Sequence, residues 1–174
     1  MQKKFTLLFF TVFSLLLITA CENEMKNPEI NIGEKFIKEL YNIDKPSIDI
    51  ENSSPEELIE FQNKFSSYFT KEEFTNLANI RFFLIPQEVS NKQNNKISVE
   101  DISFIKNDNN QKEKKETDFD FTFTLILKNQ NGDKIDEIEI NGQMSIIESN
   151  NKFKISRYYD SEPLKDVLYK TSIN

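Results

Sequence analysis

Apolar residues recur at every second position over residues 118–127. The apolar series is Phe119, Phe121, Phe123, Leu125 and Leu127. The intervening residues are polar except for Ile126. A period of two is typical of a strand with one face on the core and the other toward solvent. The pattern therefore predicts a half-buried antiparallel strand whose apolar face packs inward.

A hairpin and a returning strand are predicted next. Asn131-Gly132 is a strong hairpin signal because both residues tolerate positive φ. In the returning strand the apolar phase slips once between Ile135 and Ile138, and Gly142 marks a bend or bulge. We expect this strand to pair with the preceding one and to turn most of its isoleucines to the same face.

The sheet is expected to extend on both sides of this hairpin. Asn150-Asn151 predicts a second turn, which leads into a last strand. The side chains expected on one face of that strand are Phe153, Ile155, Arg157 and Tyr159. Upstream, an alternating segment changes phase between Val99 and Ile102, which predicts a bulge near Glu100–Asp101.

The first half of the chain has helical spacing instead. In the first predicted helix the apolar residues are Phe36, Ile37, Leu40 and Tyr41. Asn31 and Glu34 precede them as a cap pair. A second helix starts at Ser54-Pro55-Glu56-Glu57, with a capping residue, proline at the first helical position and glutamate at the third. Thr70-Lys71-Glu72-Glu73 repeats the capping box and begins a third helix.

Arg81 ends the third predicted helix, and the apolar run Phe82-Phe83-Leu84-Ile85-Pro86 follows. We interpret this run as a buried connection, and the alternative is a flap or a contact for a partner. Two segments rich in Asn and Lys, 91–95 and 107–116, predict solvated loops. Helices followed by a meander predict an α+β fold, in which N-terminal helices pack on a curved, four-stranded antiparallel sheet.

The first 21 residues have the three parts of a secretory signal. Lys3 and Lys4 precede an apolar run over residues 5–18, which is too short for a spanning helix. The closing residues Ile18-Thr19-Ala20-Cys21 resemble a bacterial lipobox, whose cysteine receives a diacylglycerol before cleavage on its amino side. The resemblance implies a lipoprotein with Cys21 as the lipidation site. The alternative is an ordinary signal peptide with a chance cysteine.

These features divide the chain into four parts. Residues 1–20 are the predicted lipoprotein signal peptide, and residues 21–32 are a flexible tether without an apolar pattern. Residues 33–160 form the α+β domain. Residues 161–174 are expected to form a C-terminal tail with a short amphipathic helix over 163–170, which is either docked on the sheet or free to meet a partner.

Composition and charge exclude several function classes. The leader carries two of the 22 basic residues and none of the 29 acidic ones, so the mature chain has a net charge of −9. That charge repels nucleic acid, so we expect no nucleic-acid partner. The sequence has no His, one Cys and three Gly, which excludes His-based catalysis, zinc clusters and glycine-rich phosphate loops. Without a D-x-D-x-D-G loop we also expect no metal site, and no cofactor.

The order of elements resembles the nuclear-transport-factor-two-like fold, also called cystatin-like, which ketosteroid isomerase shares. The resemblance covers about residues 33–160 and is carried by YFTKEEFTNLANIR at 68–81 and NGQMSIIESNNKFKISRYYD at 141–160. It implies a cone-shaped cavity between helices and sheet. Small lipoproteins of Gram-positive bacteria often contain such a domain.

Three polar residues have a strand parity that places them on the concave face of such a cone: Asp101, Arg157 and Tyr159. In ketosteroid isomerase an Asp is the base, and a Tyr with a protonated acid stabilises an oxyanion. Asp101 and Tyr159 are therefore the catalytic candidates, and Arg157 is the candidate for holding an anionic ligand. The alternative places Asp101 in a bulge, Tyr159 at the cone mouth and Arg157 in a surface ion pair.

These expectations favour a non-catalytic binding or accessory module. It would be anchored through Cys21 to the extracytoplasmic face of the cell membrane, because two acyl chains suffice for stable anchoring. Its partner would be an envelope protein or a small apolar ligand in the cone. The alternatives are an isomerase- or hydrolase-type enzyme of the cone and a homodimeric scaffold. An open cavity with an acid at its base would favour chemistry, whereas a cone filled with Phe would favour interaction through the outer surface.

Overall fold

The computed structural model describes residues 27–107, 116–161, 164–165 and 167–168. The predicted signal peptide and Cys21 lie outside the described residues. Within the described part, four α-helices and one 3₁₀ turn precede four strands. The helices are α2 (Pro28–Tyr41), α3 (Pro55–Asn63), α4 (Lys71–Asn79) and α5 (Ile85–Gln93), with η1 (Phe82–Leu84) before α5. The strands are β1 (Lys96–Asn107), β2 (Glu116–Lys128), β3 (Lys134–Ser149) and β4 (Lys152–Asp160).

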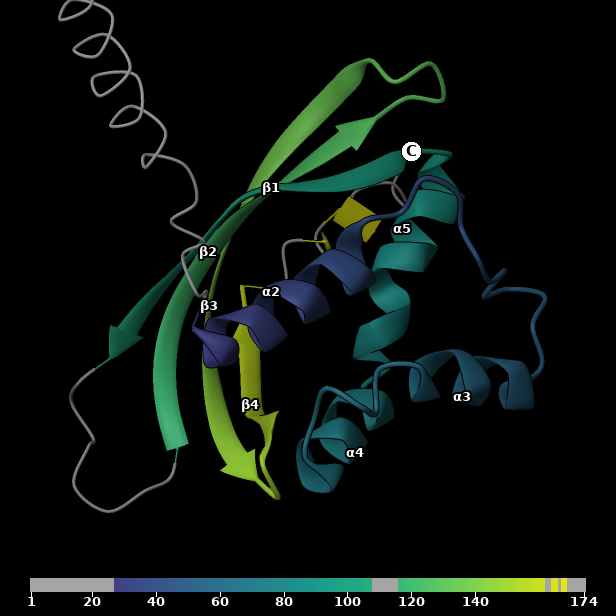
Figure 1. The fold of residues 1–174 in the computed structure, drawn as a ribbon. Coiled ribbons are helices and arrows are strands. Elements are labelled where there is room, and N and C mark those ends of the chain that lie inside the picture. Colours follow the sequence, from purple (N-terminus) through teal and green to yellow (C-terminus); the bar gives the residue numbers. More distant parts are fainter. Residues whose placement is uncertain (1–26, 108–115, 162–163, 166, 169–174) are drawn as a thin grey trace, which may run out of the picture.

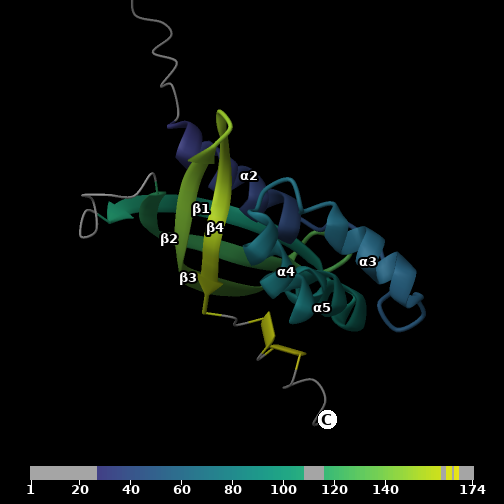
Figure 2. The same ribbon diagram turned by 90° about the horizontal axis from the view of Figure 1, so that it is seen from below.

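The strands form one antiparallel sheet in the order β1-β2-β3-β4, so each strand pairs with its neighbour in sequence. Figure 1 shows this sheet as a curved layer with α2, α3, α4 and α5 on its concave side, and Figure 2 shows the same two layers from below. The predicted α+β fold with N-terminal helices on a curved four-stranded meander is confirmed. None of the helices in the described part has the length and apolar character to cross a membrane.

Helix α2 begins earlier than predicted. The side chain of Asn27 accepts a hydrogen bond from the Glu29 backbone N–H at 3.0 Å, and Pro28 occupies the first helical position. Asn31 and Glu34 therefore lie inside the helix, and the cap pair predicted from them is wrong. The tether predicted over 21–32 is therefore wrong for residues 28–32, which are helical, and residues 21–26 lie outside the described part.

The starts of α3 and α4 follow the predicted capping pattern to different extents. At α3, Ser54 and Glu57 make both hydrogen bonds of the capping box. At α4, Thr70 accepts from the Glu73 N–H at 3.3 Å, which is half of the predicted box. The Glu73 carboxylate accepts instead from the backbone N–H of Tyr158, on β4.

The apolar run after α4 is buried, as predicted. Ile80 caps α4, and Arg81 adopts a left-handed conformation with φ of 59°. This residue turns the chain into η1, whose three side chains are buried. Helix α5 was not predicted, and its last turn takes in residues 91–93 of the expected loop.

Turns and bulges fix the register of the sheet. Gly132 has φ of 94°, in a loop of five residues between β2 and β3. Asn150 and Asn151 have φ of 52° and 56°, as a two-residue hairpin turn with positive φ at both positions requires. The bulge predicted near Glu100–Asp101 is confirmed by a register shift between Glu100 and Ser103.

Two expectations for β3 differ in outcome. The phase slip is present, because Ile135 is 55% exposed whereas Ile140 is buried. Gly142 shows no register shift. It instead allows a close approach, since an added Cβ would lie 2.3 Å from the Phe121 ring and 2.4 Å from the Tyr159 carbonyl oxygen. The extra residue of β3 is Ile135, because Leu127 pairs with Asp136 and Lys128 pairs with Lys134.

The core lies between the concave face of the sheet and the helices. All five apolar residues of the alternating series in β2 are buried, as predicted. Phe36 of α2 is in edge-to-face contact with Phe69 and Tyr158, at 4.7 and 5.2 Å between ring centroids. Beyond β4, Leu164 is also buried in this core, and Val167 and Leu168 pack against it. The space that the resemblance reserves for a cone cavity is therefore filled with aromatic and aliphatic side chains.

Candidate functional site

The three residues predicted from the sequence do not form a site. Asp101 is exposed in the β1 bulge, where it adopts a left-handed conformation with φ of 54°. Arg157 and Tyr159 are exposed on β4, and Tyr159 is 65% exposed. Since β1 and β4 are the two edges of the sheet, Asp101 and Tyr159 lie on opposite sides of the molecule's outer surface. The expectation that they face the helices together is wrong.

A bulge in β4 explains the error. Ser145 pairs with Arg157, but the next residue of β3, Ile146, pairs with Ile155. Ser156 is the extra residue, and it reverses the side-chain alternation beyond Ile155. Tyr158 consequently points inward where Tyr159 was expected.

The inward phase of β4 places a carboxylate between two tyrosines. The Tyr41 hydroxyl donates to Asp160 Oδ2 at 2.7 Å, and the Tyr158 hydroxyl donates to the same oxygen at 3.1 Å. All three residues are 5% exposed or less. Burial raises the pKa of Tyr158 well above its ordinary value, and the neighbouring Tyr41 and Asp160 reinforce the rise. We call these three residues the Tyr–Asp–Tyr cluster.

Glu73 holds the cluster from the helical layer. Its carboxylate accepts the Tyr158 backbone N–H at 2.7 Å, in a buried contact between α4 and β4. A hydrogen bond from an amide to a charged acceptor is stronger than one between neutral groups. Tyr158 is thus fixed at its backbone by Glu73 and at its hydroxyl by Asp160.

The Tyr–Asp–Tyr cluster has almost no space beside it. The cavity next to Asp160 measures about 10 Å³ and is bounded by Tyr41, Phe82, Ile140 and Leu164, among others. A cavity of that size holds about one water molecule. One acid and two phenols meet here, but the cavity beside them is too small to admit a substrate in this conformation. The cluster acts as a polar tie between α2 and the end of β4.

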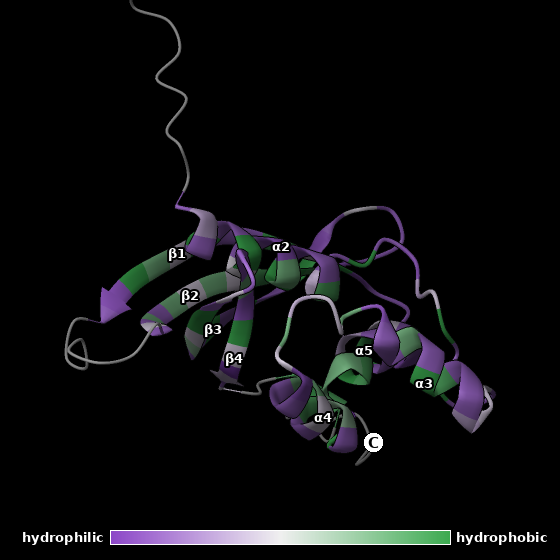
Figure 3. Ribbon diagram, turned by 60° about the horizontal axis from the view of Figure 1, so that its bottom comes forward, coloured by the Kyte–Doolittle hydropathy of each residue, from purple (hydrophilic) through white to green (hydrophobic). Residues whose placement is uncertain are grey.

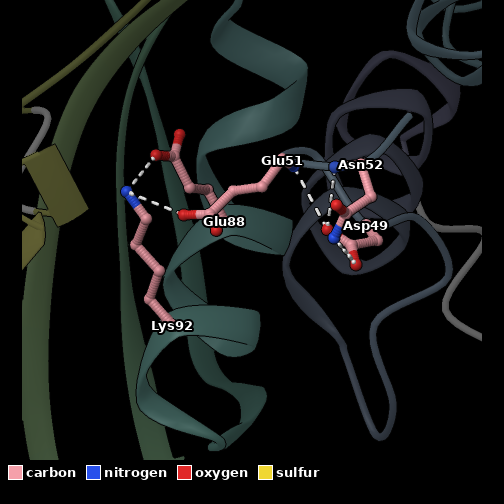
Figure 4. Close-up of polar contacts among 5 residues, drawn as sticks. All are labelled: Asp49, Glu51, Asn52, Glu88 and Lys92. Carbon is pink, nitrogen blue, oxygen red and sulfur yellow. Dashed lines mark hydrogen bonds and ion pairs between the residues drawn. The ribbon is translucent and has the colours of Figure 1, made fainter. Parts of the chain in front are cut away.

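A larger hollow lies on the surface between α5 and the loop after α2. It measures about 230 Å³ and is open to solvent. Figure 4 shows its polar groups: Lys92 is directed at Glu88 and Glu51, and Asp49 accepts from the Glu51 and Asn52 backbones. A side-chain hydrogen bond from Asn52 lowers the pKa of Asp49, and Glu88 raises that of Lys92.

These contacts tie the loop to α5, and the one lysine among the residues that line the hollow is paired with acids. The Lys92 ammonium lies 2.8 Å from the Glu88 carboxylate, so its charge is already balanced. The Asp49 carboxylate accepts three hydrogen bonds from its own turn. Among the described residues, no group of three or more His, Cys, Asp or Glu is arranged to hold a metal ion.

The convex face of the sheet carries a different arrangement, which the sequence analysis did not identify. Asp118 and Asp120 point away from the helices, on the polar side of β2. Asp118 accepts from the Ser145 hydroxyl, and Asp120 accepts from Gln143 Nε2 at 2.9 Å. Gln143 in turn accepts from Arg157 at 3.5 Å. The even-numbered residues of β2 could have predicted this arrangement from the sequence. Successive side chains of a strand point to opposite faces, so residues that alternate with the buried ones lie on the convex face.

Comparison with known proteins gives limited information. No protein-family model matches the sequence, and no curated protein matches it either. Among solved structures, the chain is similar to a periplasmic fragment of TraM, with 13% identity and a TM-score of 0.49, over 78% of this chain and 96% of that one. It is also similar to the solution structure of TraH from the Gram-positive conjugative plasmid pIP501, with 18% identity and a TM-score of 0.49, over 82% and 97% of the two chains. Similarity at this level says nothing of what this chain binds.

Proposed function

We propose that the mature protein is a lipid-anchored, extracytoplasmic module that binds an envelope partner and has no catalytic site in its interior. The observation that carries this proposal is the filled interior. The cavity beside the Tyr–Asp–Tyr cluster is lined by Tyr41 and Asp160, among others, and measures about 10 Å³. The residues predicted to be catalytic, Asp101 and Tyr159, lie outside it. A small apolar ligand is disfavoured for the same reason.

The anchor part of the proposal rests on the leader and on Cys21. Six residues separate Cys21 from Pro28, where α2 begins. A chain of that length spans at most about 25 Å. An acylated Cys21, carrying a diacylglycerol with fatty chains such as palmitate, would therefore keep the domain within about 25 Å of the membrane surface.

We also propose that the domain is nuclear-transport-factor-two-like. Support comes from the order of the elements, in which helices precede a long, curved antiparallel meander. An isomerase or hydrolase built on Asp101 and Tyr159 finds no support, because these side chains lie on the two edge strands. The homodimeric scaffold is evaluated below from the charges of the sheet.

Membrane fractionation tests the anchor. Cys21→Ser removes the thiol that would carry the lipid, so the variant should leave the membrane fraction or accumulate with its leader uncleaved. Asn23→Ser is the matched control, because it changes a neighbouring residue and retains the cysteine. The proposal fails if Cys21→Ser stays membrane-bound and is processed like the parent chain.

A further inference from the structure

No helix of the described part lies on the convex face of the sheet, although Ile126 and Ser145, which the register places on this side, are buried. Figure 1 shows the labelled helices on the concave side only, and Figure 3 shows polar and apolar residues alternating along the strands. We define the outer face by its central residues Asp118, Asp120, Thr122, Thr124, Glu139, Asn141 and Gln143, with Ile105 and Tyr159 at its two edges. These residues share one side of the sheet because each is paired across it with another of the same parity.

The centre of the outer face is negatively charged, and its carboxylates are held in place. Asp118 and Asp120 stand two positions apart on β2, so their side chains are about 6.5 Å apart along the strand. Their hydrogen-bond donors are a Ser hydroxyl and a Gln amide, which are neutral and leave both charges uncompensated. Glu139, on the next strand, accepts from the Asn141 side-chain amide, which is also neutral.

The cations near this face lie at its periphery. Lys128 and Lys134 pair with Glu100 and Glu137 at the end near the β2–β3 loop. Arg157 lies on the edge strand β4 and donates to Gln143. The centre therefore keeps an excess of negative charge.

The size and the edges of the outer face fit a protein interface. Four strands about 4.8 Å apart and about 35 Å long present roughly 700 Å², close to the ~800 Å² that each partner contributes to a standard interface. At the edges, Ile105 is 68% exposed and Tyr159 is 65% exposed. Aromatic residues such as Tyr are enriched in protein interfaces, and these two side chains would contact a partner at the edges of the outer face.

The charge of the outer face distinguishes two possible binding partners, a second copy of this chain and a protein with a basic surface. A second copy docked by this face would bring two acid-rich centres together, because a two-fold interface buries the same patch on both copies. Juxtaposed like charges disfavour that pairing. A partner with a basic surface would instead be attracted and correctly oriented.

We infer that the outer face is the docking surface for a protein partner whose matching surface is rich in Lys and Arg. The inference rests on the proposed function as a binding module, and it names the surface and the chemistry of the partner. It is independent of the lipid on Cys21.

The test uses the mature chain, residues 21–174, purified in detergent micelles, and a decalysine peptide as the probe. Amide resonances recorded during titration locate the peptide on the protein. We expect the largest shifts at Thr122, Thr124, Asn141 and Gln143. We expect the affinity to fall with added salt, since exposed charges are screened.

Two charge-matched double variants make the result specific. Asp118→Asn with Asp120→Asn keeps the shape of both side chains and removes two charges from the outer face. We expect its Kd for decalysine to rise about tenfold, which corresponds to about 1.4 kcal/mol. Glu56→Gln with Glu60→Gln removes the same charge from the exposed side of α3, and its Kd should change less than about twofold.

Three results would overturn the inference. The first is a peptide that shifts resonances of the helices and leaves those of the outer face unchanged. The second is an equal loss of affinity in both double variants, which would mean attraction to net charge alone. The third is a dimer in sedimentation that dissociates in Thr122→Lys, which would make the occupant a second copy. Release of Cys21→Ser from membranes is measured separately, so a failed anchor and a failed docking surface can be told apart.

Discussion

Strands β2 and β4 belong to the same sheet but differ in how regularly their side chains alternate between its two faces. In β2 no bulge interrupts the alternation from Phe119 to Leu125, and every residue that it predicts to be buried is buried; Ile126, which alternates with them, is buried as well. In β4 one extra residue, Ser156, reverses the alternation halfway. The comparison shows that a period of two predicts which face a side chain occupies only as far as the next bulge.

The β4 bulge also changes which residues could form a functional site. It moves Arg157 and Tyr159 out to solvent and brings Tyr158 and Asp160 into the core. An arrangement that would have been a candidate active site in the cone is replaced by a buried hydrogen-bonded tie. The outer face gains an arginine and a tyrosine from the same shift.

The largest expected effect is a charge placed on the inner face of β2. Phe121→Asp buries an unpaired carboxylate, which costs several kcal/mol against a typical stability of about 5–15 kcal/mol. We expect the variant to lose its cooperative thermal transition in circular dichroism. Thr122→Asp, one residue along on the outer face, is the control and should unfold like the parent chain. A folded Phe121→Asp would contradict the assignment of the two faces.

The next effect tests the inward end of β4. Asp160→Ala removes the acceptor of two buried hydroxyls, and each unsatisfied group costs about 1–3 kcal/mol. We therefore expect a loss of about 2–6 kcal/mol in urea unfolding. Asp120→Ala removes an acid from the outer face and should cost less than about 1 kcal/mol. Equal losses in the two variants would place Asp160 at the surface.

A smaller effect is expected at the contact between α4 and β4. Glu73→Ala leaves the buried Tyr158 N–H without its acceptor, at a cost of about 1–3 kcal/mol. Glu72→Ala is the matched control, because it also lies in the first turn of α4 but is exposed. If both variants have the same unfolding midpoint in urea, the contact between Glu73 and Tyr158 is absent.

The smallest effect is an alkaline loss of stability. Burial raises the pKa of Tyr158 in the folded chain, whereas an unfolded Tyr titrates near 10. The contribution of protonated Tyr158 to the free energy of unfolding is complete below pH ~10. It is lost as the pH rises from there through the pKa of Tyr158 in the folded chain, because in this range the unfolded chain releases the Tyr158 proton more readily than the folded chain does. Burial and Glu39 raise the pKa of Tyr68 to about 12, which adds to the same trend.

Urea unfolding between pH 8 and pH 12 measures this trend. Tyr158→Phe should flatten the decline above pH 10, and Tyr159→Phe should leave it unchanged. A decline of the same slope in both variants would assign the alkaline transition to other groups.

Much of the fold could be predicted from local signals that have few alternatives. The bulge near Asp101 was predictable because clearly apolar residues, Val99 and Ile102, fall on both sides of the phase change. In β4 the corresponding residues are Arg157, Tyr158 and Tyr159, and either phase places a tyrosine inward. Uninterrupted alternation from Ile155 would place Arg157 on the core side of the sheet. Because a charged side chain is unfavourable there, this conflict could have predicted a bulge.

The helices give a similar lesson. Asn27-Pro28 has the same pattern of a capping residue followed by proline as Ser54-Pro55, so the start of α2 could have been predicted from the sequence. Helix α5 was not predicted because its sequence is mostly polar and contains Asn. It buries few apolar side chains, of which Val89 is one. The Tyr–Asp–Tyr cluster joins residues 119 positions apart, and only the folded chain brings them together.

The difference between Tyr158 and Tyr159 is the most direct test of this account. Their side chains are 5% and 65% exposed, although the residues are adjacent. Brief treatment of the native protein with tetranitromethane, followed by tandem mass spectrometry of the peptide that contains both, measures which ring is nitrated. The account predicts nitration of Tyr159 with Tyr158 protected until the protein is unfolded. Preferential nitration of Tyr158 would contradict the bulge at Ser156, the buried tie to Asp160 and the filled interior on which the proposed function rests.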